Sequence, residues 1–209
     1  MGWVDVKISD VVKLRDDVLR GEVLGWIKLR GIFEQSEEAD PDYIFNITYP
    51  TTEIKNLIEA VNAKLKGERT TGFFEILGGY GTGKSHKLVL LYHIFKNPRK
   101  FKEWLEKLEN NTEMLDDSTI SWLKKVKSDV KIPANATVIA FSLMDEPPKY
   151  LWEPVFKGLG REDLLEKAEP YPGTALLKEA LKGKDVVVLI IDELESWYKG
   201  VGDKYNNLN

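Results

Sequence analysis

The chain has 209 residues, of which 43% are hydrophobic and 31% are charged, and its formal net charge is -4. This length and this balance are typical of a globular protein with one large domain or two small ones, and they exclude a disordered chain. The negative charge gives no overall indication of nucleic-acid binding, which a strongly basic surface would indicate, and leaves only a local basic groove open.

Cysteine is absent from the chain, which excludes disulfides, thiolate metal sites and cysteine nucleophiles. The N-terminal sequence MGWVDVKISDVVKLRDD carries charges every few residues and has no apolar signal-peptide region. No apolar run approaches the roughly 20 residues that a helix needs to span a bilayer. We therefore expect a cytoplasmic protein with no membrane partner.

Residues 1–45 are predicted to form an N-terminal region of helix and loop. Ser9 can cap a helix that carries Val11, Leu14 and Val18 on one face and ends at Gly21. The acidic stretch FEQSEEADPDY that follows is typical of a solvated surface loop.

Residues 46–209 alternate predicted helices and strands. TTEIKNLIEAVNAKLKG has apolar residues at helical spacing, with Thr51 or Thr52 as the cap and Gly67 as the stop. GFFEIL is a predicted strand. It leads through a glycine-rich loop into the helix KLVLLYHIF, on which Leu88, Leu91, Tyr92 and Phe95 are expected to form an apolar stripe.

Two amphipathic helices, in FKEWLEKLE and STISWLKKVKSD, are predicted within about 98–130, where they form a helical insertion. ATVIAFSL is a second buried strand, and helices are expected over 150–159, 161–168 and 174–182. VVVLII, residues 186–191, is continuously apolar and mostly β-branched, as in a central parallel strand. The fold class is therefore α/β, with a parallel sheet flanked by helices.

The loop between the first predicted strand and its helix matches the phosphate-binding pattern G-x-x-x-x-G-K-[ST], the P-loop or Walker A motif. Glycines let successive backbone N–H groups curl around an anion, and the start of the helix adds its positive end. A lysine at this position reaches the β- and γ-phosphates, and a serine hydroxyl is a hard ligand for Mg²⁺. The predicted nucleotide-binding residues are Gly78, Gly79, Tyr80, Gly81, Thr82, Gly83, Lys84, Ser85 and His86, the last through its backbone N–H.

The apolar strand VVVLII ends in Asp192 and Glu193, a pattern typical of a Walker B strand. An acid at that position lies beside the metal, so we expect Asp192 and Ser85 to hold Mg²⁺. Glu193 follows on the opposite side of the strand end, where a carboxylate could orient and deprotonate the attacking water. Lys84 and Glu193 are the predicted catalytic residues. The alternative interpretation is that the acidic pair caps the next helix, and Glu195 is predicted to lie on the surface.

The two histidines are not predicted to be metal ligands. His86 and His93 are seven residues apart on the P-loop helix, and two imidazoles at that spacing need a third ligand to hold an ion. We expect both to be partly buried and hydrogen-bonded.

The run ILGGYGTGKSH followed by LYH, with TYPT ahead of it, resembles the AAA-type ATPases of prokaryotic phage-defence and restriction-like loci. The resemblance covers about residues 45–95 and the acidic strand. It implies a P-loop ATPase of the ASCE class, with Lys84, Ser85, Asp192 and Glu193 in the usual roles, and it implies that residues 48–51 lie near the adenine. ATP is then the substrate and Mg²⁺ the cofactor.

The chain departs from that family because little sequence follows Asp192. In AAA-type ATPases a further strand slots between the acidic strand and the P-loop strand, and a lid and a finger arginine come later. We therefore expect the N-terminal part of a larger ATPase, with a sheet that is incomplete at its C-terminal side and an exposed apolar seam. The seam would be covered by self-association or by the C-terminal part of the parent chain.

The resulting functional hypothesis is an ATPase module whose parent remodels nucleic acid or protein, which the resemblance associates with anti-phage defence. Hydrolysis by this chain alone should be weak or absent. The alternative hypothesis is a nucleotide-gated interaction switch with little or no hydrolysis. A small-molecule kinase is disfavoured, because the segment after ATVIAFSL has only Arg161 for an arginine-rich lid.

Overall fold

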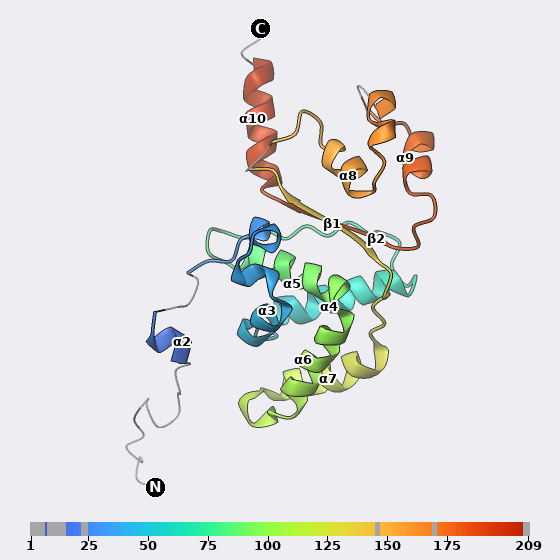
Figure 1. Ribbon diagram of the computed structural model, residues 1–209. Coiled ribbons are helices and arrows are strands. Elements are labelled where there is room, and N and C mark those ends of the chain that lie inside the picture. The colour runs from blue at the N-terminus through green and yellow to red at the C-terminus, as the bar shows by residue number, and fades with distance from the viewer. Residues whose placement is uncertain (1–6, 8–15, 22–24, 145–146, 169–170, 207–209) are drawn as a thin grey trace.

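The computed structural model describes residue 7 and residues 16–21, 25–144, 147–168 and 171–206 (Figure 1). The helices and strands of these residues are α2 (Asp16–Leu19), η1 (Leu29–Phe33), η2 (Glu37–Ala39), α3 (Pro41–Ile47), α4 (Thr52–Leu65), α5 (Lys84–Lys96), α6 (Pro98–Glu109), η3 (Thr112–Met114), α7 (Asp117–Asp129), β1 (Thr137–Ser142), α8 (Glu153–Gly158), η4 (Glu162–Leu164), η5 (Glu166–Ala168), α9 (Thr174–Ala180), β2 (Val187–Asp192) and α10 (Leu194–Asn206), where η is a 3-10 helix. Most of the helix predicted between Ser9 and Gly21 lies outside the described residues.

The predicted strands around ATVIAFSL and VVVLII are confirmed, and they pair in parallel as β1 and β2. Thr137 lies opposite Val187, and Ser142 lies opposite Asp192. Because side chains alternate along a strand, Val138 and Ala140 face one hydrophobic cluster and Ile139 faces another. The sheet is therefore covered by helices on both faces, as a parallel sheet requires.

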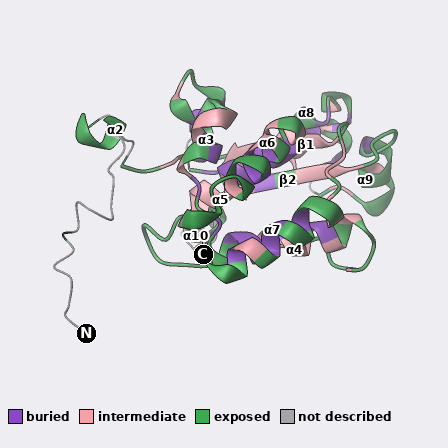
Figure 2. Ribbon diagram, turned by 90° about the horizontal axis from the view of Figure 1, so that it is seen from below, coloured by how far each residue is buried: buried purple, intermediate pink, exposed green. Residues whose placement is uncertain are grey.

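The helices form two layers around this sheet. Figure 1 shows α3 to α7 on one side and α8 and α9 on the other. The larger cluster is centred on α5, which is buried on most sides, and Figure 2 shows the buried residues on the inward-facing parts of the helices. The most buried residues of α5 are Val89, Leu90, His93 and Ile94. Leu91 and Phe95 of the predicted stripe are also buried, and Leu88 and Tyr92 pack against the same cluster, so the buried surface of α5 is wider than the stripe, because the helix packs against the sheet and against other helices at once.

The strand predicted over GFFEIL is wrong. Residues 72–77 are described as loop, and their backbone makes no hydrogen bond to the backbone of another described residue. The side chains of Phe73 and Leu77 are 70% and 78% exposed. An apolar segment becomes a strand only by pairing with a neighbour, and β1 and β2 are the only strands among the described residues. The fold seen here is thus mixed α/β with a two-stranded parallel sheet.

Exposed apolar side chains, expected along an incomplete sheet, are present at this segment and on β2. Leu189 in the middle of β2 is 43% exposed although the strand is otherwise largely covered. The domain boundary near residue 45 and the status of 98–130 as an insertion stay predictions.

The helices predicted within 98–130 are confirmed as α6 and α7. Asn97 precedes the first-turn proline of α6, and Phe101, Trp104 and Leu105 are buried as their spacing predicted. Phe45 of α3 stacks on Trp104 with ring centroids 5.6 Å apart. Aromatic pairs of this kind contribute roughly 0.5–1.5 kcal/mol beyond their burial.

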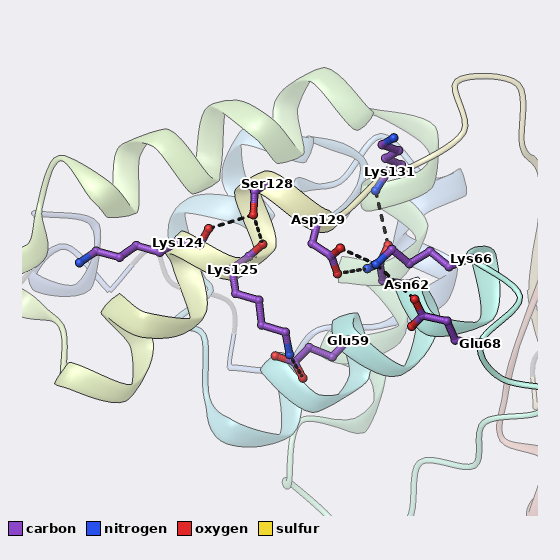
Figure 3. Close-up of polar contacts among 9 residues, drawn as sticks. All are labelled: Glu59, Asn62, Lys66, Glu68, Lys124, Lys125, Ser128, Asp129 and Lys131. Carbon is purple, nitrogen blue, oxygen red and sulfur yellow. Dashed lines mark hydrogen bonds and ion pairs between the residues drawn. The ribbon is translucent and has the colours of Figure 1, made fainter.

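Polar contacts join α4 to α7 along the outer edge of the helical layer (Figure 3). Asn62 donates a hydrogen bond to Asp129 at 3.0 Å, and Lys66 pairs with the other oxygen of the same carboxylate. Lys125 pairs with Glu59 at 3.1 Å. Asp129 thus receives two donors from the end of α4, which fixes the register of the two helices.

Several further predicted helices are confirmed in shorter form. α4 begins after Thr51, whose hydroxyl accepts a hydrogen bond from the N–H of Ile54, as the cap prediction required. The helix predicted over 150–159 is α8, and that over 174–182 is α9. Residues 161–168 form two 3-10 turns instead of one α-helix. No helix in the described part of the chain is long and apolar enough to cross a membrane.

The stretch predicted to be a solvated loop holds a buried carboxylate. Glu38 is 5% exposed and accepts hydrogen bonds from the N–H of Lys28 and the hydroxyl of Ser36. Its carbonyl oxygen accepts a hydrogen bond from the ring of His93 at 2.7 Å. This segment therefore packs against α5 as part of the fold, because its polar groups find partners there.

His93 is a buried neutral histidine, as expected from its sequence context. Asn97 donates to its Nδ1, so its Nε2–H donates to the Glu38 carbonyl. Burial lowers the pKa of His93, although the hydrogen bond to Glu38 and the nearby charge of Asp40 oppose that shift. Protonation would remove the acceptor that Asn97 uses.

We predict that the protein loses stability as the pH falls below about 6.5, the pKa of an unfolded histidine. The depressed folded pKa means that the unfolded state binds more protons, so the free energy of unfolding decreases by up to about 1.4 kcal/mol per pH unit for this histidine. Urea unfolding at pH 7.5 and 5.5 measures the change. The His93→Gln variant should be less stable at pH 7.5 and have a shallower pH dependence, and an unchanged slope would refute the assignment.

Candidate functional site: the glycine loop and the end of β2

The loop of residues 78–83 turns the chain directly into α5. Gly83 precedes the helix with φ of 75°, in the left-handed region that favours glycine. At Gly78 a side chain is excluded, because a Cβ would lie 2.5 Å from the hydroxyl oxygen of Thr82. That hydroxyl donates to the Gly79 carbonyl at 2.9 Å. Tyr80 at the tip of the loop is fully exposed.

Lys84 folds back over this loop. Its ammonium donates to the carbonyl oxygens of Gly78 and Gly79, at 2.9 and 2.8 Å. A mobile positive charge therefore lies at the start of α5, where the positive end of the helix adds to it. This combination attracts anions, and phosphate oxygens can compete with the two carbonyls for the ammonium.

Ser85 and Asp192 meet although they are far apart in the sequence. The Ser85 hydroxyl donates to Oδ2 of Asp192 at 2.8 Å, and the contact is partly buried. Asp192 is the last residue of β2, and Ser85 is in the first turn of α5, so the packing of α5 against β2 brings them together. A hydroxyl and a carboxylate are the hard oxygen ligands that Mg²⁺ prefers.

Glu193 adopts an unusual backbone conformation immediately after β2. Its φ is 60°, the only positive value among the described non-glycine residues. Such a conformation costs roughly 1–3 kcal/mol, so the surrounding structure must hold it. The N–H of Glu193 donates to Oδ1 of Asp192 at 3.0 Å. Both carboxylate oxygens of Asp192 are thus used, one on each side of the strand end.

The Glu193 side chain is exposed and accepts a hydrogen bond from the hydroxyl of Ser196 at 3.0 Å, in the first turn of α10. This contact is compatible with the capping interpretation, and the position beside Asp192 is compatible with the water-activating one. Both interpretations of Glu193 therefore stay predictions.

Glu195 is a carboxylate whose position the sequence did not indicate. It is bound by Lys199, whose hydrogen bond and charge lower its pKa, and the charge of Lys84 adds to this shift. The side chain is exposed, as predicted, and the positive charge of Lys84 makes the smallest contribution to its lowered pKa. The spacing of Glu195 from Asp192 in the sequence could not predict the interaction with Lys84, because that interaction depends on the direction in which α10 leaves β2.

The turn at residues 48–51 contacts the helix that carries the P-loop lysine. The Thr48 hydroxyl donates to the Ile44 carbonyl at 2.7 Å, so it accepts the Nε2–H of His86, also at 2.7 Å. Burial, and secondarily the charge of Lys87, lowers the pKa of His86. The segment that the resemblance places near the adenine therefore lies beside the start of α5.

A second set of contacts fixes this turn from the other side. Tyr49 donates from its hydroxyl to Asp116 at 3.1 Å, and Lys55 donates to Ser118 and Thr119. Hydrogen bonds, first from Ser118 and then from Thr119, hold the pKa of Asp116 far below its usual range. Asp116 precedes α7, and an Asp before a helix with Ser and Thr following is a capping signal. Its contact with Tyr49, however, has no signal in the sequence.

The described residues contain no group of three or more His, Asp or Glu side chains that could hold a metal by themselves. Ser85 and Asp192 can supply one hydroxyl and one carboxylate oxygen, so any Mg²⁺ there would need further oxygens from water or phosphate. That donor set fits a metal that arrives with a nucleotide.

Residues 32–207 match the model of the DUF499 N-terminal domain, and the chain belongs to this family. No curated protein and no solved structure matches the chain.

We predict that Thr48→Val destabilises the protein by about 1–3 kcal/mol, because the variant leaves the buried Ile44 carbonyl and the His86 ring without their partner. Urea unfolding gives the free-energy difference. Thr52→Val, at an exposed position in the first turn of α4, serves as the control and should change the free energy of unfolding by less than about 0.5 kcal/mol. Equal effects of the two substitutions would contradict the role of the Thr48 hydroxyl.

Proposed function

We propose that this chain is the ATP-binding module of a larger P-loop ATPase that hydrolyses ATP to drive remodelling of nucleic acid or protein. The hydrogen bond between Ser85 and Asp192 carries the proposal. Walker A and Walker B patterns predict that two residues distant in the sequence meet at one metal position, and a glycine-rich turn with no such role has no reason to bring them together. The resemblance to AAA-type ATPases and the N-terminal designation of the family support the larger parent protein.

In this proposal the loop and Lys84 bind the phosphates. The backbone of residues 78–83 and the start of α5 surround them with N–H groups, and the Lys84 ammonium exchanges its two carbonyl partners for β- and γ-phosphate oxygens. Ser85 and Asp192 would hold Mg²⁺ together with oxygens from water and phosphate, and the metal would supply positive charge beside the phosphates. Glu193 orients and deprotonates the attacking water.

A nucleotide-gated switch with little turnover is the second candidate. It is favoured by the loop conformation of residues 72–77 and by the contact of Glu193 with Ser196. Residues 72–77 add no strand beside the site, and the Glu193 carboxylate is bound to Ser196 and not held toward an attacking water. In this alternative, bound ATP would order the loop, and the interaction with a partner would be the output.

We predict that Lys84→Ala weakens the binding of ATP with Mg²⁺ at least about tenfold, because the phosphates lose the charge that contacts them directly. Titration calorimetry on the chain and the variant measures this. Lys87→Ala removes the same charge from the next turn of α5 and should bind ATP nearly as the unchanged chain does. Phosphate release on the same samples should be weak or absent. Binding that is equal in the two variants would overturn the phosphate role of Lys84.

We predict that Glu193→Gln in the full-length parent protein reduces phosphate release by about a hundredfold or more while ATP binding is kept, because the amide cannot take a proton from water. Glu195→Gln, two residues further along, removes a carboxylate whose pKa the charge of Lys84 also lowers, and it should leave turnover close to normal. If Glu195→Gln stops turnover and Glu193→Gln does not, the two roles are exchanged. If the unchanged parent binds ATP without measurable phosphate release and neither substitution alters this, the switch alternative is favoured.

A further inference from the structure

A cavity lies on the side of the sheet opposite α5, in the part of the fold that contains α8 and α9 (Figure 1). It has a volume of about 280 Å³ and is lined by Tyr150, Trp152, Glu153, Leu165 and Glu166. The lining comes from the segment that leads into α8, from the first residue of α8, and from the junction of η4 and η5. None of these residues takes part in the proposed nucleotide site.

Two aromatic rings form one wall of this cavity. Tyr150 and Trp152 are stacked with their centroids 4.6 Å apart and an angle of 10° between their planes. The ammonium of Lys149 lies 4.6 Å from the centroid of the Tyr150 ring. A cation therefore already interacts with the Tyr150 ring, as expected for the electron-rich face of an aromatic side chain.

Two carboxylates add negative charge to the same cavity. Within the described residues, neither Glu153 nor Glu166 has a hydrogen bond or ion pair from its side chain. The neighbouring acids differ, because Asp163 and Glu179 both pair with Arg161. Asp163 and Glu179 are thus neutralised by Arg161, whereas the two carboxylates that line the cavity have no such partner among the described residues.

We propose that this cavity binds a guanidinium group, as presented by an arginine side chain. The planar cation can stack on the outer face of Trp152 in the stacked pair, because Trp152 and the Lys149 ammonium already lie against Tyr150, and its five N–H donors can reach carboxylates at the rim. The volume lies just below the lower end of the range for small-molecule sites, roughly 300 Å³, and so suits one long side chain. An anionic ligand would meet two uncompensated carboxylates and is excluded.

A guanidinium fits better than a simple ammonium. The flat stacked pair offers a planar surface, and an ammonium gains nothing from planarity, whereas a guanidinium stacks through its own plane. This inference is independent of the nucleotide site, since it uses no residue of the glycine loop or of the β2 end.

The test uses a peptide of sequence Gly-Arg-Gly with blocked ends and the same peptide with citrulline, which has the shape of arginine without the charge. The arginine peptide should bind at least about tenfold more tightly in calorimetric titrations, because only the cation gains from the rings and carboxylates. Agmatine, a small molecule with the same guanidinium group, is titrated in parallel to distinguish a polypeptide ligand from a small-molecule ligand. Tighter binding of the peptide indicates a polypeptide partner, and tighter binding of agmatine indicates a small molecule.

The variants locate the binding. Glu153→Gln with Glu166→Gln keeps the size of the side chains and should remove the preference for arginine over citrulline, while Glu162→Gln, outside the cavity, should leave it unchanged. The indole N–H signal of Trp152, identified by its loss in Trp152→Phe, should shift on addition of the arginine peptide. Equal affinity for the two peptides, no binding at millimolar concentration, or a preference that survives the double substitution would overturn the proposal.

Discussion

The contact between α5 and the carboxyl end of β2 is the constraint on which the candidate site depends. It places Ser85 against Asp192, and Asp192 in turn holds the N–H of Glu193 with its other oxygen. One carboxylate therefore holds both the Ser85 hydroxyl and the backbone of Glu193. The strained backbone at Glu193 is tolerated because the strand on one side and α10 on the other determine the path of the chain.

α5 has this role because it is the most enclosed helix of the fold. Its apolar side chains fill the larger hydrophobic cluster, and its two histidines bond to segments that precede it in sequence, His86 to Thr48 and His93 to the Glu38 carbonyl. Both imidazoles have their pKa lowered by burial, so they stabilise the fold in their neutral forms. The first turn of α5 is thus fixed both by its contact with the end of β2 and by its contact with the segments that precede it in the sequence.

The face of the sheet opposite α5 has a different character. α8 and the turns that follow it form a small cluster of their own around Phe156 and Leu164, and the aromatic cavity lies at its edge. Side chains that alternate along β1 and β2 contribute to the clusters on both faces. The proposed nucleotide site and the proposed guanidinium site therefore use different residues on different faces of the sheet.

The sequence by itself determined the elements that depend on local signals: the caps and spacing of α4, α6 and α7, the two continuous apolar strands, and the glycine pattern that turns into α5 at Lys84. It also indicated that Ser85 and Asp192 lie together.

Tertiary structure decided the rest. GFFEIL is apolar enough for a strand, but no described strand pairs with it, and strand formation requires a neighbour. Glu38 is acidic yet buried, because donors from Lys28 and Ser36 reach it only in the folded chain. The position of Glu195 near Lys84 and the stacked rings beside Glu153 likewise arise from contacts between segments that no local pattern encodes.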